Sequence, residues 1–299
     1  MRFAAWLVLL ATLLLWSGNW IVARAVRDEI APGVATLGRL VIVLCVLLPF
    51  VWRPLREKLG RLGARDWKVL AALGFAGGGL HLALQWLGLH YTTATSAVLY
   101  LSTSPIFILL LAPLLGESIH PRQWSGVVIS LCGVAIIAAQ GEPARLASLS
   151  LNRGDLMALA SMAMWASYTV LLRMRRDALG TVELIVMVCA FGAFFMLPWV
   201  WVELAGGARI VPSPTGAAAV LYSALGSLLL AYAGWSYVVT RIGAARAGAT
   251  MHLMPALGIG LAALFLGEYP QGFHLAGIAL ILAGVTLSSF RASTASSIR

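Results

Sequence analysis

Long apolar runs that carry no charged residue constrain this chain more than any other feature of its sequence. Such runs cover residues 69–89, 94–115 and 248–267. Only 11% of the residues are charged and 61% are hydrophobic, whereas a typical soluble domain has about 25% charged residues. A helix crosses a bilayer core with about 20 apolar residues, and it satisfies its backbone hydrogen bonds within one segment. The sequence therefore predicts an all-α integral membrane protein.

Charged and Pro/Gly-rich breaks between the apolar runs predict ten transmembrane helices. Their expected ranges are 3–23, 34–52, 67–88, 94–115, 122–140, 154–173, 181–204, 216–239, 244–266 and 271–290. With the N-terminus inside, cytoplasmic segments hold 15 of the 21 Lys and Arg residues, the opposite side holds five, and Arg39 lies within a span. This asymmetry predicts a multi-pass protein of the cell (inner) membrane with both termini in the cytoplasm. Lys58 and Arg299 would then face inward, and Arg145 and Arg209 outward. The net charge of +10 is thereby explained without a nucleic-acid partner.

The chain also repeats itself at an offset of 149 to 151 residues. The matched residues are Trp16 with Trp165, Arg24 with Arg173, Trp86 with Trp235, Pro105 with Pro255, and Gly116-Glu117 with Gly267-Glu268. Each half holds five predicted helices, so the second half would cross the membrane in the inverted orientation. Inverted repeats of this kind are typical of secondary transporters. We expect a first five-helix repeat over 1–141, a linker over 142–152, a second, inverted repeat over 153–291, and a cytoplasmic tail over 292–299.

The paired Gly-Glu motifs would lie on opposite faces of the membrane, which argues against a joint catalytic role for the two glutamates. We expect Gly116 and Gly267 to end a helix in the left-handed conformation. Glu117 and Glu268 would then stabilise the positive N-terminal end of the following helix. A gating or proton-binding role is the alternative.

Several stretches resemble EamA-type members of the drug/metabolite transporter superfamily. "LLLWSGNWIVAR" is similar to the first-helix motif of that family, "LGRLVIVLCVLL" to the second helix with its arginine, and "LGLHYTTATSAVLYLSTSPIFILLLAPLLGES" to the third and fourth helices. The resemblance covers both repeats and implies a ten-helix carrier that exports small metabolites. Abundant Trp and Tyr in the spans resemble the YddG-type amino-acid exporters. The second repeat departs from the pattern, because "MWASYTVLLR" lacks the Ser-Gly-Asn of the first.

A polar and aromatic stripe at matching depth in helices one and six predicts a shared substrate cavity. Trp16, Asn19 and Trp20 fall on one face of helix one, and Trp165 and Tyr168 occupy equivalent positions on helix six. The alternative is that these aromatic residues belong to the interfacial belts common in membrane proteins.

Other polar or aromatic residues within the spans extend the predicted cavity. They are Arg39 on helix two, His81 and Gln85 on helix three, Tyr100 and Ser104 on helix four, Tyr232 and Trp235 on helix eight, and His252 on helix nine. The alternatives are packing between helices for the polar residues and, for Arg39, extension of the side chain to the membrane interface. Pro105 and Pro255 would act as hinges, or simply as kinks.

The sequence has no motif for catalysis, for nucleotide hydrolysis or for a cofactor or metal. We therefore expect no enzyme activity and no cofactor, and the expected partners are a small-molecule substrate and the lipid bilayer, with the oligomeric state left open. The leading hypothesis is a secondary transporter that exports small metabolites, foremost amino acids including aromatic ones, by alternating access. The alternatives are a broad drug or nucleoside exporter, a membrane-embedded lipid-modifying enzyme, and a receptor or scaffold. His81 and His252 are the expected titratable residues in the middle of the spans.

Overall fold

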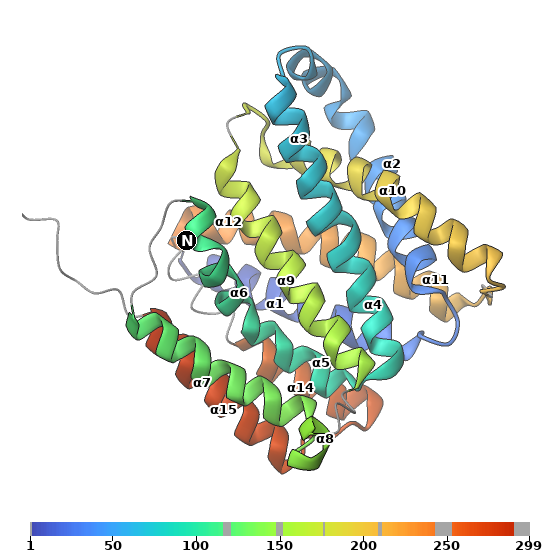
Figure 1. The fold of residues 1–299 in the computed structure, drawn as a ribbon. Helices are drawn as coiled ribbons and strands as arrows, with labels where there is room; N and C mark the ends of the chain where they lie inside the picture. The colour runs from blue at the N-terminus through green and yellow to red at the C-terminus, as the bar shows by residue number, and fades with distance from the viewer. Residues whose placement is uncertain are drawn as a thin grey trace, which may run out of the picture.

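Helices form all the regular secondary structure in the part of the chain that the structure describes. This computed structural model describes residues 2–115, 121–147, 152–175, 177–208, 211–242 and 253–289. The helices of the first half are α1 (Arg2–Ala25), α2 (Pro32–Leu59), α3 (Ala64–Leu73), η1 (Gly74–Leu80), α4 (His81–Tyr91), α5 (Ala94–Leu99), η2 (Tyr100–Thr103), α6 (Ser104–Leu111), η3 (Ala112–Leu115), α7 (Pro121–Ala138) and α8 (Pro143–Ala147) (Figure 1). Those of the second half are α9 (Arg153–Met174), α10 (Thr181–Ala205), α11 (Pro214–Leu221), η4 (Tyr222–Leu230), α12 (Ala231–Ile242), α14 (Leu253–Leu266) and α15 (Gly272–Ser289).

Seven stretches of helix among the described residues are long and apolar enough to cross a membrane. They are Ala4–Ala25, Pro32–Leu59, Ala64–Tyr91, Ala94–Leu111, Arg153–Leu172, Thr181–Ala205 and Pro214–Trp235. Three shorter apolar helices are Trp124–Ile137, Leu253–Leu266 and Gly272–Gly284. The chain is thus a multi-pass, all-helical membrane protein. Each of these stretches overlaps one of the ten predicted ranges, and the ninth range, 244–266, begins outside the described residues.

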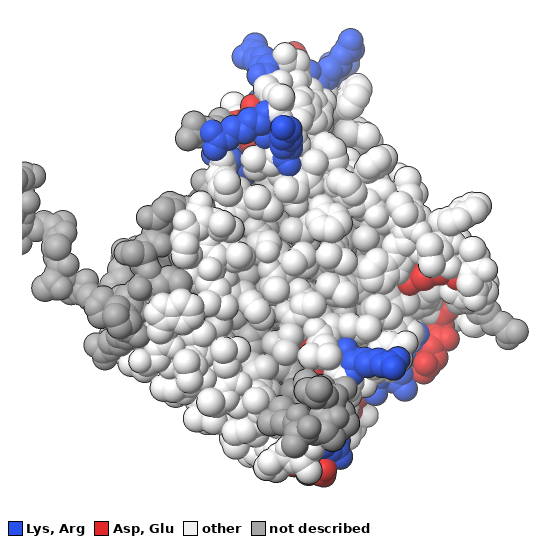
Figure 2. Space-filling view, viewed as in Figure 1, with Lys and Arg blue, Asp and Glu red and all other residues white. Residues whose placement is uncertain are grey.

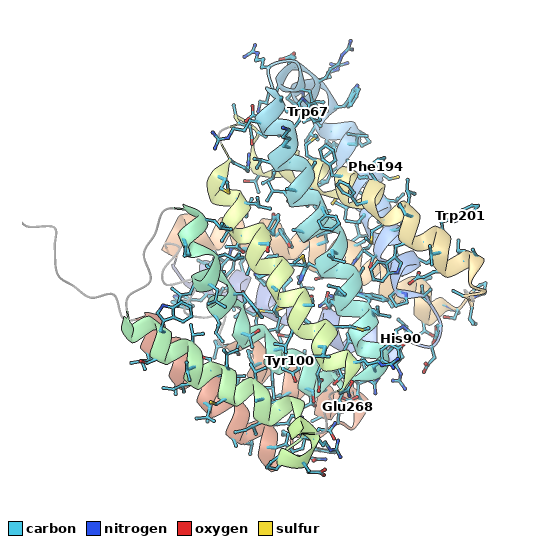
Figure 3. All side chains as sticks on the ribbon, in the orientation of Figure 1. Trp67, His90, Tyr100, Phe194, Trp201 and Glu268 are labelled. Carbon is cyan, nitrogen blue, oxygen red and sulfur yellow. The ribbon has the colours of Figure 1, made fainter. Side chains whose placement is uncertain are left out.

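The charges on the surface are separated by a broad uncharged face (Figure 2). Exposed basic residues gather at the end of the molecule formed by the turn between α2 and α3: Arg53, Arg56, Arg61, Arg65 and Lys68. Along the uncharged face, α10 directs Phe194 and Trp201 outward (Figure 3), with 63% and 75% of their surfaces exposed. Large apolar side chains exposed at this position along a helix are expected to contact lipid tails.

The two halves of the chain pack helix against helix. α2 lies against α10, α4 against α9, α1 against both α12 and α14, and α6 against α9. α7 and α15 lie side by side along one edge of the molecule (Figure 1). Their backbones approach closely because glycines face each other, and a Cβ on Gly133 would lie 2.5 Å from the carbonyl oxygen of Gly277. Small residues at such crossings let helices pack tightly in a membrane.

Two of the membrane-spanning segments contain a π-helical stretch in the middle. In η1, the N–H of His81 bonds to the carbonyl of Ala76, and in η4 that of Ala231 bonds to Gly226. Each bond joins residues five apart, rather than four apart as in an α-helix. His81 and Ala231 are themselves separated by 150 residues, which is the spacing of the sequence repeat.

The neighbouring helices α2 and α10 are joined at both ends. At one end, Lys58 near the end of α2 forms an ion pair with Glu183, 2.7 Å from Nζ to Oε2. Glu183 also accepts a bond from the N–H of Gly180 at 2.6 Å, and thereby caps the start of α10. At the other end, Glu203 accepts bonds from the N–H groups of Gly33 (3.0 Å) and Val34 (3.3 Å) in the first turn of α2. A carboxylate at a helix N-terminus satisfies free N–H groups and complements the helix dipole.

Candidate functional site

A cavity of about 100 Å³ lies between helices from both halves of the chain. Side chains of α1, α2, α4, η2, α6, α9, η4, α12 and α14 line it. The lining residues are Trp16, Asn19, Trp20, Arg39, His81, Leu82, Gln85, Leu101, Ser104, Met162, Trp165, Ser223, Ser227, Leu228, Tyr232 and Met254. Nine residues predicted from the sequence are therefore brought together: Trp16, Asn19, Trp20, Arg39, His81, Gln85, Ser104, Trp165 and Tyr232.

A chain of buried hydrogen bonds joins four of the helices around the cavity. Arg39 on α2 donates from Nη1 to Oγ of Ser223 on η4 at 2.9 Å. Ser223 donates in turn to Oδ1 of Asn19 on α1 at 2.6 Å. Asn19 donates from Nδ2 to Oε1 of Gln85 on α4 at 3.2 Å. These bonds fix the polar wall of the cavity, because a buried polar group without a partner is costly.

Arg39 lies fully inside the bundle, with 1% of its surface exposed. The alternative that it extends to the membrane interface is therefore wrong. Its guanidinium carbon lies 5.5 Å from the centre of the Trp86 ring, in a cation–π contact. Its Nε and Nη2 atoms have no hydrogen-bond partner in the described part of the chain.

Aromatic rings form another part of the cavity wall. Tyr232 lies between the two tryptophans of the repeat, with ring centres 5.8 Å from Trp16 and 6.4 Å from Trp165. The Trp16 indole N–H donates to the carbonyl oxygen of Ser227 at 3.0 Å, within the π-helical stretch η4. Both contacts with Tyr232 are edge-to-face, the geometry that aromatic pairs favour.

His81 is held by α9 as well as lining the cavity. Its Nδ1 donates to the carbonyl oxygen of Ser161 at 2.9 Å, and Ser161 Oγ donates back to the His81 carbonyl at 2.8 Å. The imidazole ring also contacts Trp165, with ring centres 5.3 Å apart. His81 therefore combines the two alternatives considered for it, packing between helices and facing the cavity.

The structure places three predicted residues behind the lining. Tyr168 contacts Trp165 and Trp235 contacts Trp16, with ring centres 5.4 Å and 5.5 Å apart, so both support the aromatic wall. Tyr100 is fully buried in the hydrophobic core, at the start of the 3₁₀ turn η2, and Figure 3 shows it inside the bundle. His252 lies outside the described residues.

The two proposed hinge prolines lie near the start of α6 and near the start of the described part of α14. The helix that contains Pro105 is irregular, because the 3₁₀ turn η2 separates α5 from α6 directly before it. Pro105 is then the second residue of α6, where its missing N–H removes little helical bonding. Pro255 is buried in the first turn of α14 as described.

Sequence reasoning missed polar residues that matter in the site. Ser223 and Ser227 on η4 form part of the cavity wall, and their spacing of four residues on one helix face is the signal that would have identified them. Asp155, in the first turn of α9, is buried with 1% exposure and accepts a bond from Thr92. Its position near the expected end of a span hid this burial.

An ion pair links the turn between α14 and α15 to α1. Arg24 Nε lies 3.2 Å from Glu268 Oε1, and the other carboxylate oxygen accepts a bond from the N–H of Thr95 in the first turn of α5. The turn begins as predicted, because Gly267 has a φ of +66° directly after α14. Glu268 was expected to stabilise the following helix, but its side chain contacts α1 and α5 instead. Gly116 and Glu117 lie outside the described residues.

A bundle of membrane-spanning helices around a polar and aromatic cavity is typical of small-molecule transporters. The chain matches the model of the EamA-like transporter family twice, over residues 3–139 and 152–290, and it belongs to that family. This membership confirms the expectation that the chain is a transporter and not an enzyme.

Three known proteins resemble the whole chain. An uncharacterised transporter of Archaeoglobus fulgidus is 29% identical over 95% of this chain and 96% of its own length. A probable terminal-alkyne amino-acid exporter of Streptantibioticus cattleyicolor is 28% identical over 96% of this chain and 94% of its own. A solved crystal structure with a TM-score of 0.58 covers 97% of each chain at 21% identity, so it shares the fold.

Proposed function

We propose that this protein is a secondary transporter of the inner membrane that exports amino acids, including aromatic ones, by alternating access. The observation that carries the proposal is the cavity itself, whose described lining combines a hydrogen-bonded polar group around Arg39 with the three aromatic rings of Trp16, Trp165 and Tyr232. An amino acid with an apolar side chain can place its carboxylate near the first and its side chain against the second. The name of the Streptantibioticus relative supports amino acids as the class and export as the direction.

Alternating access by an inverted repeat is supported by the way the two halves pack. α9 is the repeat counterpart of α1, and the contacts of α1 with α12 and α14 correspond to those of α9 with α4 and α6. The π-helical stretches η1 and η4 also occupy equivalent positions. Two equivalent sets of contacts around one cavity would let the halves exchange roles when the cavity opens to the other side.

The aromatic wall gives a direct test of the proposed function. Trp16→Ala or Trp165→Ala should weaken transport of phenylalanine about two- to tenfold more than that of threonine, because a lost ring contact costs about 0.5–1.5 kcal/mol beyond area burial. The measurement is uptake by proteoliposomes, normalised to folded carrier. Trp201→Ala is the matched control, because Trp201 is 75% exposed on the outer face of α10 and should leave the substrate ratio unchanged.

Two results would count against this proposal. Equal losses for phenylalanine and threonine in the Trp16 and Trp165 variants would show that these rings only support packing. Uptake of nucleosides or cationic drugs in preference to every amino acid would favour the broad exporter instead.

Membrane orientation is expected to follow the basic residues. Single cysteines replacing Arg61, at the turn between α2 and α3, and Asp28, after α1, should differ in labelling by an impermeant thiol reagent in intact cells. The cysteine at 28 should react and that at 61 should react only after permeabilisation, because the basic end is expected in the cytoplasm. Both positions are exposed, so access to the reagent is the only difference tested. Labelling at 61 in intact cells would refute the proposed orientation.

A further inference from the structure

We propose that Arg39 binds the carboxylate of the transported molecule, so that the cavity selects small carboxylates and does not require their amino group. This inference rests on the proposed function and specifies which chemical group is recognised. It predicts that a carboxylic acid without an amine binds, and that an amine without a carboxylate is rejected.

The first support is the isolation of the Arg39 charge. Among the described residues that line the cavity, Arg39 is the only charged one. Four acidic residues near helix ends have partners outside the cavity: Asp155 accepts from Thr92, Glu183 pairs with Lys58, Glu203 accepts from the start of α2, and Glu268 pairs with Arg24. An unpaired charge inside a protein is costly. The contact with Trp86 recovers only part of that cost.

The second support is the pair of guanidinium atoms that stays without a partner. Nη1 is bonded to Ser223, whereas Nε and Nη2 have no partner in the described part of the chain. These two nitrogens form one edge of the planar guanidinium, which donates two parallel hydrogen bonds to a carboxylate. The bond to Ser223 and the contact with Trp86 hold the group, so the unpartnered edge, which is buried in this conformation, has a set orientation before a substrate arrives.

The third support is the lack of a carboxylate for the substrate's amine. No Asp or Glu is among the described residues that line the cavity. An ammonium group would meet only the aromatic faces and neutral oxygens, while adding a second positive charge beside Arg39. The amine is therefore tolerated when a carboxylate accompanies it, and disfavoured when it comes alone.

Competition experiments with the wild-type protein in proteoliposomes test whether the carboxylate, rather than the amine, is recognised. Counterflow of labelled phenylalanine is measured against 3-phenylpropionate, which has the ring and the carboxylate, and phenethylamine, which has the ring and the amine. We expect 3-phenylpropionate to compete within about threefold of unlabelled phenylalanine, and phenethylamine to compete at least about tenfold more weakly, since a hydrogen bond to a charged group contributes about that factor or more. Equal competition by the two analogues would overturn the proposal.

Substitutions at Arg39 test whether this residue causes the preference for 3-phenylpropionate over phenethylamine. In the folded Arg39→Gln variant, we expect 3-phenylpropionate to lose its advantage over phenethylamine as a competitor. In the Arg39→Lys variant, we expect this advantage to be reduced, because lysine keeps the charge but lacks the two parallel N–H donors of arginine. Asn19→Asp should reduce it as well, by placing a carboxylate in the same hydrogen-bonded chain. Arg27→Gln is the control, since Arg27 pairs with exposed Asp28. If 3-phenylpropionate keeps its advantage in the folded Arg39→Gln variant, the assignment of Arg39 as the carboxylate-binding residue is refuted. If that variant does not fold, the competition experiment with the wild-type protein decides the proposal.

A different result would show that the proposed function is wrong while the role of Arg39 is still open to test. If wild-type carrier moves no amino acid, export of amino acids is refuted. Quenching of tryptophan fluorescence by 3-phenylpropionate, with phenethylamine as the comparison, then decides the role of Arg39 separately. Binding of the acid and not of the amine supports the carboxylate site, and the reverse order overturns it.

Discussion

Gly192→Ala is expected to lower the melting temperature of the purified protein by about 5–10 °C, the shift that roughly 3 kcal/mol produces in a chain of this size or somewhat smaller. A Cβ on Gly192 in α10 would lie 2.8 Å from the carbonyl carbon of Gly78 and 3.0 Å from its Cα, in η1. Backbone atoms cannot rotate away as a flexible side chain can, so the two helices must separate. Overpacking of this kind costs about 1–3 kcal/mol or more.

Gly260→Ala in α14 is the matched control for this substitution. A Cβ there meets no atom within 4 Å, and alanine favours a helix over glycine by about 1 kcal/mol. The control should therefore melt at the same temperature as the wild type or slightly higher. Thermal unfolding in one detergent, followed by intrinsic fluorescence, compares the two. A Gly192→Ala protein as stable as the control would show that α10 and η1 do not pack this closely.

Deletion of Ala83 is expected to abolish transport, whereas deletion of Gly79 should leave much of it intact. Gly79 lies in η1, whose bonds between residues five apart accommodate one additional residue in the helix. Without Gly79, the bond from the N–H of His81 to Ala76 joins residues four apart, as in an α-helix, so the two ends of the span keep their relative orientation. Ala83 lies in the regular helix α4, where removing one residue turns the two ends relative to each other by about 100°. Either His81 or Gln85 then leaves the cavity wall. Proteoliposome uptake of phenylalanine per folded carrier measures the loss.

A deletion in an exposed turn separates this effect from that of shortening the chain. Gly207 follows α10, has a φ of +81°, and has no atom within 4 Å of a Cβ placed on it. Its deletion should leave most of the uptake intact. Equal loss of uptake after deletion of Gly79 and after deletion of Ala83 would contradict the view that η1 accommodates one additional residue without turning the cavity residues.

The sequence predicted the helices and much of the cavity because membrane spans and repeats leave strong periodic signals. Trp16 and Trp165 were found through their offset of 149 residues, and both line the cavity. Asn19, His81 and Gln85 were found because polar side chains inside an apolar span must face protein or water. Such inferences depend on position along one helix, which the sequence displays directly.

Other features depend on contacts between distant segments, which no local pattern displays. The bond from Ser223 to Asn19 joins residues 204 positions apart, and Glu268 finds Arg24 at a separation of 244. The π-helical stretches escaped detection for a related reason. The extra residue of η4 changes which positions of the span lie on one face of the helix. A regular α-helical pattern therefore did not place Ser223 and Ser227 on the same face as Tyr232.

The way the cavity is assembled bears on how its specificity can evolve. No single helix supplies the lining, since segments from both halves each contribute a few side chains. α7 and α15 contribute none of the described lining residues and pack mainly against each other. Substitutions at one lining position can thus alter the range of molecules accepted while the glycine-mediated helix crossings that hold the bundle together stay unchanged. Gene duplication followed by such changes would yield carriers that share one fold and transport different substrates.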